Sequence, residues 1–406
     1  MIDEITHTPW VQLTLPALVA LSMVFWIFFR ILKIAKDKNV VDNPDARKLQ
    51  SEPVPVMGGI AVFFGVMSAL LVGCILMDCS VLLPVICAMV VMLYMGAMDD
   101  VIGMTPMSRL IAEMLVVTGI IYGSGQCIDS LHGLWGIESV SWWIAVPMTV
   151  FACTGVINAI NMIDGVNGLN SGLCLTCSAL FGAVMVKRGD MVNAMLAFTT
   201  AAALFPFLLH NVFGKRSRMF IGDAGTMIMG TVMTWFMISL LSSEANRVDE
   251  QFGVVALAIA VLSVPVFDTL RVMALRILRG QSIFQADKTH LHHAFIAVGV
   301  SHSITALSEI LLNLAVVGIW YTAYRCGASV DVQFYVAVAA ALVLVWGAYA
   351  LLWYGAQDNA FGRKLQSKTP RTHLGHTKRW LRFEKWLDAP EDRLADKYEL
   401  TKDKKH

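Results

Sequence analysis

Charge is scarce in this chain: Asp, Glu, Lys and Arg make up 15% of its 406 residues, against roughly 25% in a typical soluble domain. Hydrophobic residues make up 57% of the chain, and the mean hydropathy is +0.64. This balance excludes an ordinary soluble protein and predicts an integral membrane protein. We therefore expect the lipid bilayer, and not a nucleic acid, as its main partner.

Four further absences narrow the class of protein. The apolar runs do not alternate in the way a transmembrane barrel requires, and no internal repeat is visible, which disfavours transporters built from duplicated halves. No cleavable signal peptide is expected, because the first apolar run lacks a basic leader. The cysteines do not suggest a disulfide framework, since most of them lie within predicted spans and are expected to serve packing.

Long apolar runs are abundant, and spanning a bilayer takes about 20 such residues per helix. We predict an all-α polytopic membrane protein with about eleven transmembrane helices, centred near residues 21, 66, 89, 115, 151, 177, 200, 230, 263, 314 and 343. Residues 1–355 are predicted to form the transmembrane catalytic domain, and residues 356–406 a basic cytoplasmic tail.

Orientation follows from the positions of Lys and Arg, which favour cytoplasmic loops. With the N-terminus outside, fourteen basic residues fall in inside loops and four in outside loops, leaving the tail aside. We therefore predict an outside N-terminus and a cytoplasmic C-terminus.

One polar stretch interrupts the apolar runs, NAINMIDGVNGL at residues 158–169. Asn158, Asn161 and Asp164 recur every three residues, so on a continuing helix they share one edge. Gly165 and Gly168 flank Asn167 and permit a tight turn against a ligand. A helix cap is the simpler alternative, but acidic and histidine clusters at matching places favour a site.

Two acidic positions lie at other cytoplasmic edges. Asp99 and Asp100 are adjacent at the end of the third span, where their mutual repulsion favours a bound cation or a proton. Asp223 lies between Gly222 and Ala224 at the start of the eighth span, after Asn211 and a basic segment. Mg²⁺ suits such sites, because it binds one or two carboxylates together with substrate phosphates. A hydrated acid pair and a helix cap remain the alternatives.

Basic and histidine residues complete the candidate site. Arg47 and Lys48 precede the second span and suit either phosphate binding or the charge rule for inside loops. The last inside loop contains His290, His292 and His293, which could donate hydrogen bonds to phosphate. Zn²⁺ is a less suitable metal ion than Mg²⁺ for this site, because the nearby acids are better suited to a hard cation. Asp268 and Arg271 lie one turn apart upstream and could be no more than a salt bridge.

The order of Asp99-Asp100, NAINMIDGVNGL, FIGDAG and THLHH resembles the polyprenyl-phosphate N-acetylhexosamine-1-phosphate transferases over roughly residues 10 to 355. The resemblance implies transfer of a sugar 1-phosphate from a UDP-sugar to undecaprenyl phosphate, giving a lipid-linked pyrophosphoryl sugar and UMP for cell-envelope glycan synthesis. It also implies Mg²⁺, with Mn²⁺ as a substitute, at the inner membrane of a bacterium. A homodimer is compatible with it.

The resemblance also implies a role for each motif residue. Asp99 and Asp100 are expected to be catalytic, and Asp223, Asn161 and Asp164 to bind the metal. The residues expected to bind substrate are Lys48, Asn158, Asn167, Asn211, His290, His292 and His293. The sequence departs from these relatives at three positions. Asn167 stands where many of them have an acid, Gln50 where they often have a histidine, and Gly103 where some have an acid.

The spacing HLHH is closer to the branch that uses GlcNAc-1-phosphate than to the phospho-MurNAc-pentapeptide transferases. The alternative functions are a phospho-MurNAc-pentapeptide-type transferase, an ion-coupled transporter and a membrane lipid phosphatase. A transporter would place its acids around a midplane cavity, whereas these acids are predicted at one membrane face.

The tail contains a pattern typical of an amphipathic helix, with Trp380, Phe383 and Leu387 at near-helical spacing among basic residues. Such a helix favours the anionic inner leaflet. We expect it to lie there and to be dispensable for the chemistry.

The orientation can be tested by cysteine labelling in intact cells. Cysteines introduced near residues 45, 104, 217 and 288 should react only with reagents that enter the cytoplasm, and those near 130, 245 and 328 should react from outside. Labelling of position 217 from outside would contradict both the orientation and the shared active face.

Overall fold

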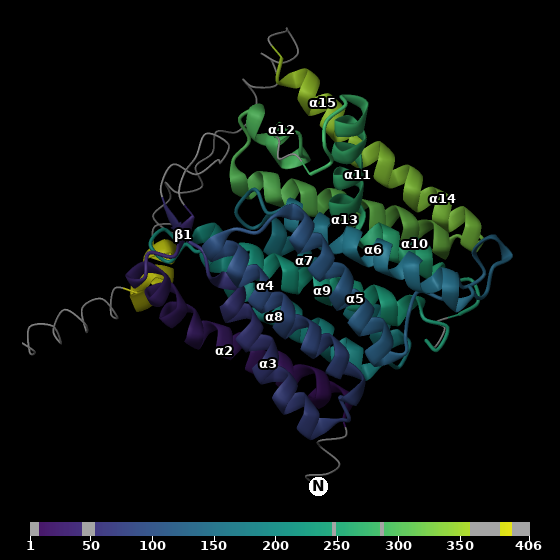
Figure 1. Ribbon diagram of the computed structural model, residues 1–406, viewed down its shortest axis with the longest axis horizontal. Coiled ribbons are helices and arrows are strands. Elements are labelled where there is room, and N and C mark those ends of the chain that lie inside the picture. The colour runs from purple at the N-terminus through teal and green to yellow at the C-terminus, as the bar shows by residue number, and fades with distance from the viewer. Residues whose placement is uncertain (1–7, 43–52, 246–248, 285–287, 358–381, 392–406) are drawn as a thin grey trace, which may run out of the picture.

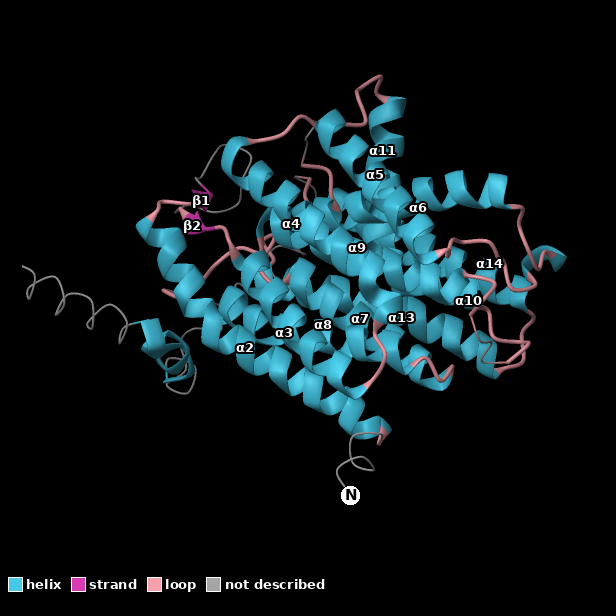
Figure 2. Cartoon of the chain, turned by 60° about the horizontal axis from the view of Figure 1, so that its bottom comes forward, coloured by secondary structure: helices cyan, strands magenta, loops and turns pink. Residues whose placement is uncertain are grey.

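The computed structural model describes residues 8–42, 53–245, 249–284, 288–357 and 382–391, and it is almost entirely helical (Figures 1 and 2). Within this part of the chain, ten helices are long and apolar enough to cross a membrane, and a bent helix pair makes eleven. The predicted number and the predicted centres of the spans are confirmed. The predicted span near residue 263 differs from the others in being the bent pair.

The helices follow one another with short connections. In chain order they are α2 (Pro9–Asp37), α3 (Gly58–Leu76), α4 (Leu83–Ile102), α5 (Pro106–Ser124), α6 (Trp142–Met162), α7 (Leu169–Lys187), α8 (Met191–Phe213), α9 (Gly222–Leu241), α10 (Val254–Val261), α11 (Ser263–Leu278), α12 (Leu291–Ala297), α13 (His302–Arg325), α14 (Val330–Ala341) and α15 (Gly347–Gly355). A π-helical turn at Leu342–Trp346 joins the last two, so that they form one span.

Helix α9 is the centre of the bundle (Figure 1). Its membrane-spanning window is completely buried, and it packs against α3, α4, α6 and α7. The approach of α4 is close because Gly96 lies directly against the backbone of Ala224. A side chain at position 96 would force the two helices apart, so this glycine brings the end of α4 to the start of α9.

The bent pair α10 and α11 turns by 73° at a break near Leu262. Such a break frees backbone groups that the bilayer cannot satisfy. Asn313 of α13 supplies hydrogen-bond partners for these backbone groups. Its Nδ2 donates to the Val261 carbonyl (2.9 Å), and its Oδ1 accepts from the Val264 amide (3.1 Å). The bend therefore has a buried polar support, and it directs α11 toward α12 and α15 (Figure 1).

A small β-structure fixes the entry to α9. Strands β1 (Val41–Asp42) and β2 (Val54–Pro55) pair antiparallel, and the segment after β2 continues alongside the chain that leads into α9. Phe220 donates its amide to the Pro55 carbonyl (2.8 Å), and Gly59 donates to the Ile221 carbonyl (2.7 Å). These bonds hold Gly222 and Asp223 at the start of α9.

A helix of the tail, residues 382–391, lies beside the end of α2, where Glu391 pairs with Lys36 (yellow in Figure 1). Its Asp388 accepts hydrogen bonds from the amides of Arg216 (3.1 Å) and Ser217 (3.0 Å) and from the Ser217 hydroxyl (2.7 Å). Leu387 is buried, and Phe383 packs against Phe213. The described part of the predicted amphipathic stripe thus contacts protein, while Trp380 lies outside the described residues.

We predict that Asp388→Asn loosens this helix. Hydrogen bonds to a charged group each contribute about 1.5–3 kcal/mol, so loss of the charge should raise hydrogen–deuterium exchange of residues 382–391 about 10-fold or more. Glu384→Gln on the same helix is the control, because Glu384 makes no hydrogen bond to any described residue. Equal exchange in the two variants would show that Asp388 does not hold the helix.

Candidate active site

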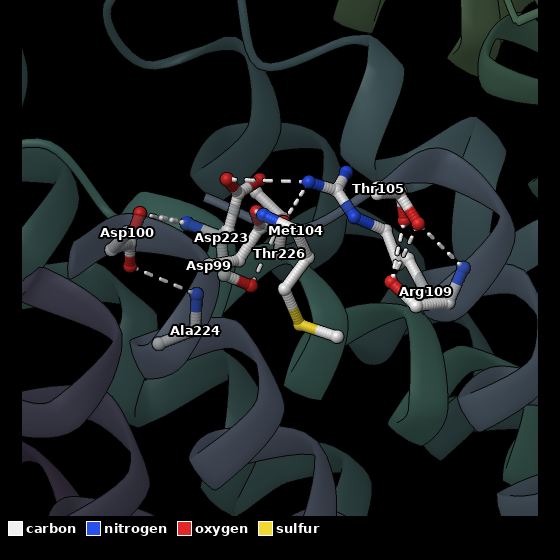
Figure 3. Close-up of polar contacts among 9 residues, drawn as sticks. Asp99, Asp100, Met104, Thr105, Arg109, Asp223, Ala224 and Thr226 are labelled. Carbon is white, nitrogen blue, oxygen red and sulfur yellow. Dashed lines mark hydrogen bonds and ion pairs between the residues drawn. The ribbon is translucent and has the colours of Figure 1, made fainter. Parts of the chain in front are cut away.

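The first amides of α9 are capped by an acid from another helix. Asp100, at the end of α4, accepts the amide of Asp223 through Oδ1 (2.9 Å) and that of Ala224 through Oδ2 (3.2 Å). Helix α9 has no capping side chain of its own. A carboxylate satisfies free amides and favours the positive end of the helix dipole. Asp100 therefore positions Asp223 (Figure 3).

Asp99 lies on the other side of Asp223 and pairs with Arg109 of α5 (Figure 3). It also accepts the Met104 amide at 2.7 Å, so the chain after α4 turns around its carboxylate. Arg109 lies 3.6 Å from a carboxylate oxygen of Asp223 as well. The guanidinium thus bridges two acids that the sequence places 124 residues apart (223 − 99).

Asp164 lies in the turn between α6 and α7, within electrostatic range of Asp100 and Asp223. The residue is exposed to solvent, while neighbouring protein atoms partly desolvate its carboxyl. Desolvation by those atoms, together with the charges of Asp223 and Asp100, raises the pKa of Asp164 to about 7. The structure therefore brings four predicted acids, Asp99, Asp100, Asp164 and Asp223, into one acidic cluster.

The asparagines of the NAINMIDGVNGL stretch divide into two groups. The Nδ2 of Asn161 is buried without a hydrogen-bond partner among the described residues, and it could donate to a phosphate. A half-turn of the amide would offer its oxygen to a metal instead. Asn158 donates to Glu113 of α5 and to the Thr154 carbonyl, so it joins α5 to α6.

The loop around Asn167 is held from α8. Asn211 accepts the Gly168 amide (2.6 Å) and donates to the Met219 carbonyl (2.8 Å), so it ties this loop to the segment before α9. Asn167 is half-buried, and no hydrogen bond of its side chain is seen among the described residues. Asn158 and Asn211 thus act here as links between elements, which is a structural contribution that their spacing did not indicate.

The histidine segment reaches the same turn from the other half of the bundle. His292 is buried, and its ring lies against Gly165, the neighbour of Asp164. His290 stacks on His292 with ring centroids 5.6 Å apart, and His293 contacts His292 at 4.3 Å. Burial and the neighbouring histidines hold the pKa of His292 well below its usual value, so its imidazole is neutral. Lys48 lies outside the described residues.

Two charged residues near the cluster were not among the sequence-predicted site residues. Arg109 and Glu113 both lie on α5, which contains none of the predicted site residues. Glu113 is fully buried one helical turn from Arg109, and its Oε1 has no hydrogen-bond partner among the described residues. An acid within a transmembrane span is itself a signal of function, so Glu113 could have been found from the sequence.

The donor set suits a hard cation. No group of three or more His, Cys, Asp or Glu side chains in the described residues is arranged to hold a metal without other ligands. Mg²⁺ does not need such a cage, because it binds through one or two carboxylates and completes its shell with water and substrate phosphates. Asp223 and Asp164 offer carboxylate oxygens to solvent. The residues therefore fit the predicted Mg²⁺ site.

Comparison with known proteins finds similarity over the part of the chain that carries this site. Residues 82–241, from the start of α4 to the end of α9, match glycosyl transferase family 4. Over 312 residues the chain is 29% identical to the undecaprenyl-phosphate alpha-N-acetylglucosaminyl 1-phosphate transferase of Yersinia pestis, covering 73% of this chain and 81% of that protein. The protein of the same name in Escherichia coli is 28% identical over 308 residues, covering 73% and 80%. A probable undecaprenyl-phosphate N-acetylglucosaminyl 1-phosphate transferase of Bacillus subtilis is 28% identical over 314 residues, covering 77% and 84%.

The contact between Asp100 and α9 can be tested at Gly222. This residue has φ +74°, and a Cβ atom there would lie 2.6 Å from an Asp100 oxygen. Gly222→Ala should displace the Asp100 carboxylate and lower activity by about 10² or more. Gly103 has φ +79° with no atom within 4 Å of such a Cβ, so Gly103→Ala imposes the same backbone strain without the clash. Comparable losses in the two variants would refute a specific role of the Asp100 contact.

Proposed function

The chain belongs to glycosyl transferase family 4 and is a polyprenyl-phosphate sugar-1-phosphate transferase of the membrane, and from this premise we propose that its sugar is GlcNAc. In this proposal GlcNAc-1-phosphate passes from UDP-GlcNAc to undecaprenyl phosphate, and UMP is released. The names of the three relatives support the acceptor and the sugar. The HLHH spacing supports the same sugar.

The observation that carries the reaction type is the acidic cluster bridged by Arg109. Asp99 and Asp223 both approach the same Nη2 nitrogen of Arg109, and Asp164 adds a further negative charge nearby. Two phosphate-bearing substrates would be repelled from such a cluster unless a cation joined them. Phosphoryl transfer is catalysed mainly by positioning and charge stabilisation, and the cluster supplies both when Mg²⁺ binds.

In the proposed mechanism, Asp223 and Asp164 would hold Mg²⁺, with Asn161 beside them. The ion would neutralise the pyrophosphate and stabilise the departing UMP. Arg109 can turn from its carboxylates toward the phosphate oxygens, and His290, His292 and His293 would border the donor from the opposite side. Lys48, Asn158, Asn167 and Asn211 remain proposed substrate residues, the second and fourth through the loops that they hold.

The contacts of Asp99 and Asp100 support a different role for each. Both oxygens of Asp100 accept amides of α9, so this acid fits a positioning role. Asp99 is paired with Arg109, whose side chain can move to a phosphate and release it. Asp99 is therefore the better candidate for accepting the proton of the lipid phosphate, which frees an oxygen for attack on the β-phosphorus of the donor.

The function is tested with purified enzyme, labelled UDP-GlcNAc, undecaprenyl phosphate and Mg²⁺. We expect labelled lipid product, and UDP-MurNAc-pentapeptide should not replace the donor. Release of free sugar phosphate would instead indicate a membrane hydrolase that uses water as the acceptor. The absence of any turnover, with ion-driven uptake in vesicles, would indicate a transporter.

The metal site is tested by Asp223→Asn, which keeps the size and removes the charge. We expect transfer to fall by about 10² to 10³ in a protein that still folds, together with loss of Mn²⁺ binding measured by electron paramagnetic resonance. Asn167→Asp is the control, since it adds a carboxylate in the neighbouring loop and should change mainly the KM for the UDP-sugar. Normal turnover and Mn²⁺ binding in Asp223→Asn would remove Asp223 from the metal site.

A further inference from the structure

The histidine segment is held by a single buried acid of α11, Asp268. This side chain is 1% exposed, and it lies at the centre of contacts from three directions. Its Oδ2 is 2.8 Å from Nδ1 of His290, and both of its oxygens accept the Leu291 amide, at 3.1 and 3.2 Å. Asp268 therefore fixes both the backbone and the ring at the start of α12.

Helix α12 depends on this contact because it has no capping side chain of its own. His290 occupies the N-cap position, where its imidazole makes no capping hydrogen bond. An acid from a different helix takes that place, just as Asp100 does for α9. Any shift of Asp268 would therefore move the first residues of α12 and the His290 ring together.

Arg271 keeps Asp268 in place. Its guanidinium donates to Asp268 Oδ1 (2.6 Å) and to the Thr289 carbonyl (2.5 Å), and it stacks on Tyr349 of α15 at 3.4 Å. A buried charge pair is costly unless such additional bonds satisfy it. These contacts connect α11, the segment before α12, and α15 around Asp268.

The contacts continue from His290 to the acidic cluster. His290 lies parallel to His292, at an interplanar angle of 6°, and the His292 ring rests on Gly165 beside Asp164. A side chain at position 165 would meet the imidazole directly. The position of Asp268 is thus transmitted through two stacked rings to the turn that carries Asp164.

We propose that Asp268 is a positioning residue for the transfer reaction, which holds His290 with a proton on Nδ1 and its ring in register with His292 and the Asp164 turn. A carboxylate that accepts from one imidazole nitrogen fixes the tautomer and leaves the other nitrogen for the ligand. In this chain the ligand is the diphosphate of the sugar donor, so the inference rests on the proposed function. Asp268 itself does not touch the substrate.

The first test follows the tautomer and needs no activity. In protein labelled with ¹⁵N-histidine, His290 should carry a proton on Nδ1, with its signal identified by its loss in His290→Asn. Asp268→Asn should shift that signal, because an amide replaces the charged acceptor. Glu309→Gln is the matched control: Glu309 is also buried and interacts electrostatically with Asp268 and Arg271, but it does not contact His290. An unprotonated Nδ1 in the wild type would overturn the proposal whichever sugar the enzyme uses.

The second test is a double-mutant cycle in the transfer assay. Carboxylates that orient a ligand histidine contribute about 10- to 100-fold in affinity or activity, so Asp268→Asn should lower kcat/KM for the sugar donor by that factor. His290→Asn should cost a similar factor, and the double variant should be no worse than either, since both act through the same ring. Additive losses, or a loss in Glu309→Gln equal to that in Asp268→Asn, would overturn the proposal.

Asp268→Glu separates positioning from stability. It keeps the charge opposite Arg271, so the protein should fold even if Asp268→Asn does not. We expect its longer side chain to restore part of kcat/KM. A folded Asp268→Glu with no more activity than Asp268→Asn at equal thermal stability would contradict a role through the His290 hydrogen bond. If the wild type transfers another sugar 1-phosphate, the same ratios are measured with that donor, and only the GlcNAc assignment fails.

Discussion

The hydrogen bonds from the first amides of α9 to Asp100 are the contact on which the site depends. They join the end of α4 to the start of the most buried helix, and they place Asp223 beside Asp99 and Arg109. A carboxylate at a helix N-terminus gains from both the free amides and the helix dipole. The charge distribution, the helix packing and the geometry of the acidic cluster therefore depend on the same few atoms. The close approach at Gly96 is what allows that contact to form.

The bilayer imposes a second constraint, because each freed backbone group needs a protein partner. The break between α10 and α11 satisfies it through Asn313, and the resulting bend carries Asp268 to the histidine segment. A straight span would have kept α11 parallel to its neighbours and its acid away from α12. One buried amide thus makes possible a site assembled from both halves of the chain.

Acids that cap helices from outside recur in this protein. Asp100 caps α9, Asp268 caps α12, and Asp388 binds the amides that follow α8. Each acid lies on another helix, between 23 and 171 residues along the chain from the amide that it binds. These hydrogen bonds hold the ends of helices and the neighbouring loops in place through backbone amides. The polar side chains of the same segments therefore stay available to substrates.

The residue pattern alone predicts the class of the protein, the number of spans and the residues of the acidic cluster. The length of an apolar run and an acid at its end are local features, and a bilayer makes both of them easy to recognise in a sequence. The pattern could not assign partners. Asp99 and Asp100 are neighbours in sequence, yet one pairs with Arg109 and the other caps α9. Asn158 and Asn211 were expected only at the substrate, and their hydrogen bonds that link helices and loops could not be predicted from their spacing. From the sequence, Asp268 could be interpreted only as a salt bridge with Arg271, since its bond to His290 spans 22 residues and the segment between α11 and α12. Those assignments depend on which helices approach each other, and only tertiary packing around α9 and the bend at Leu262 decides that.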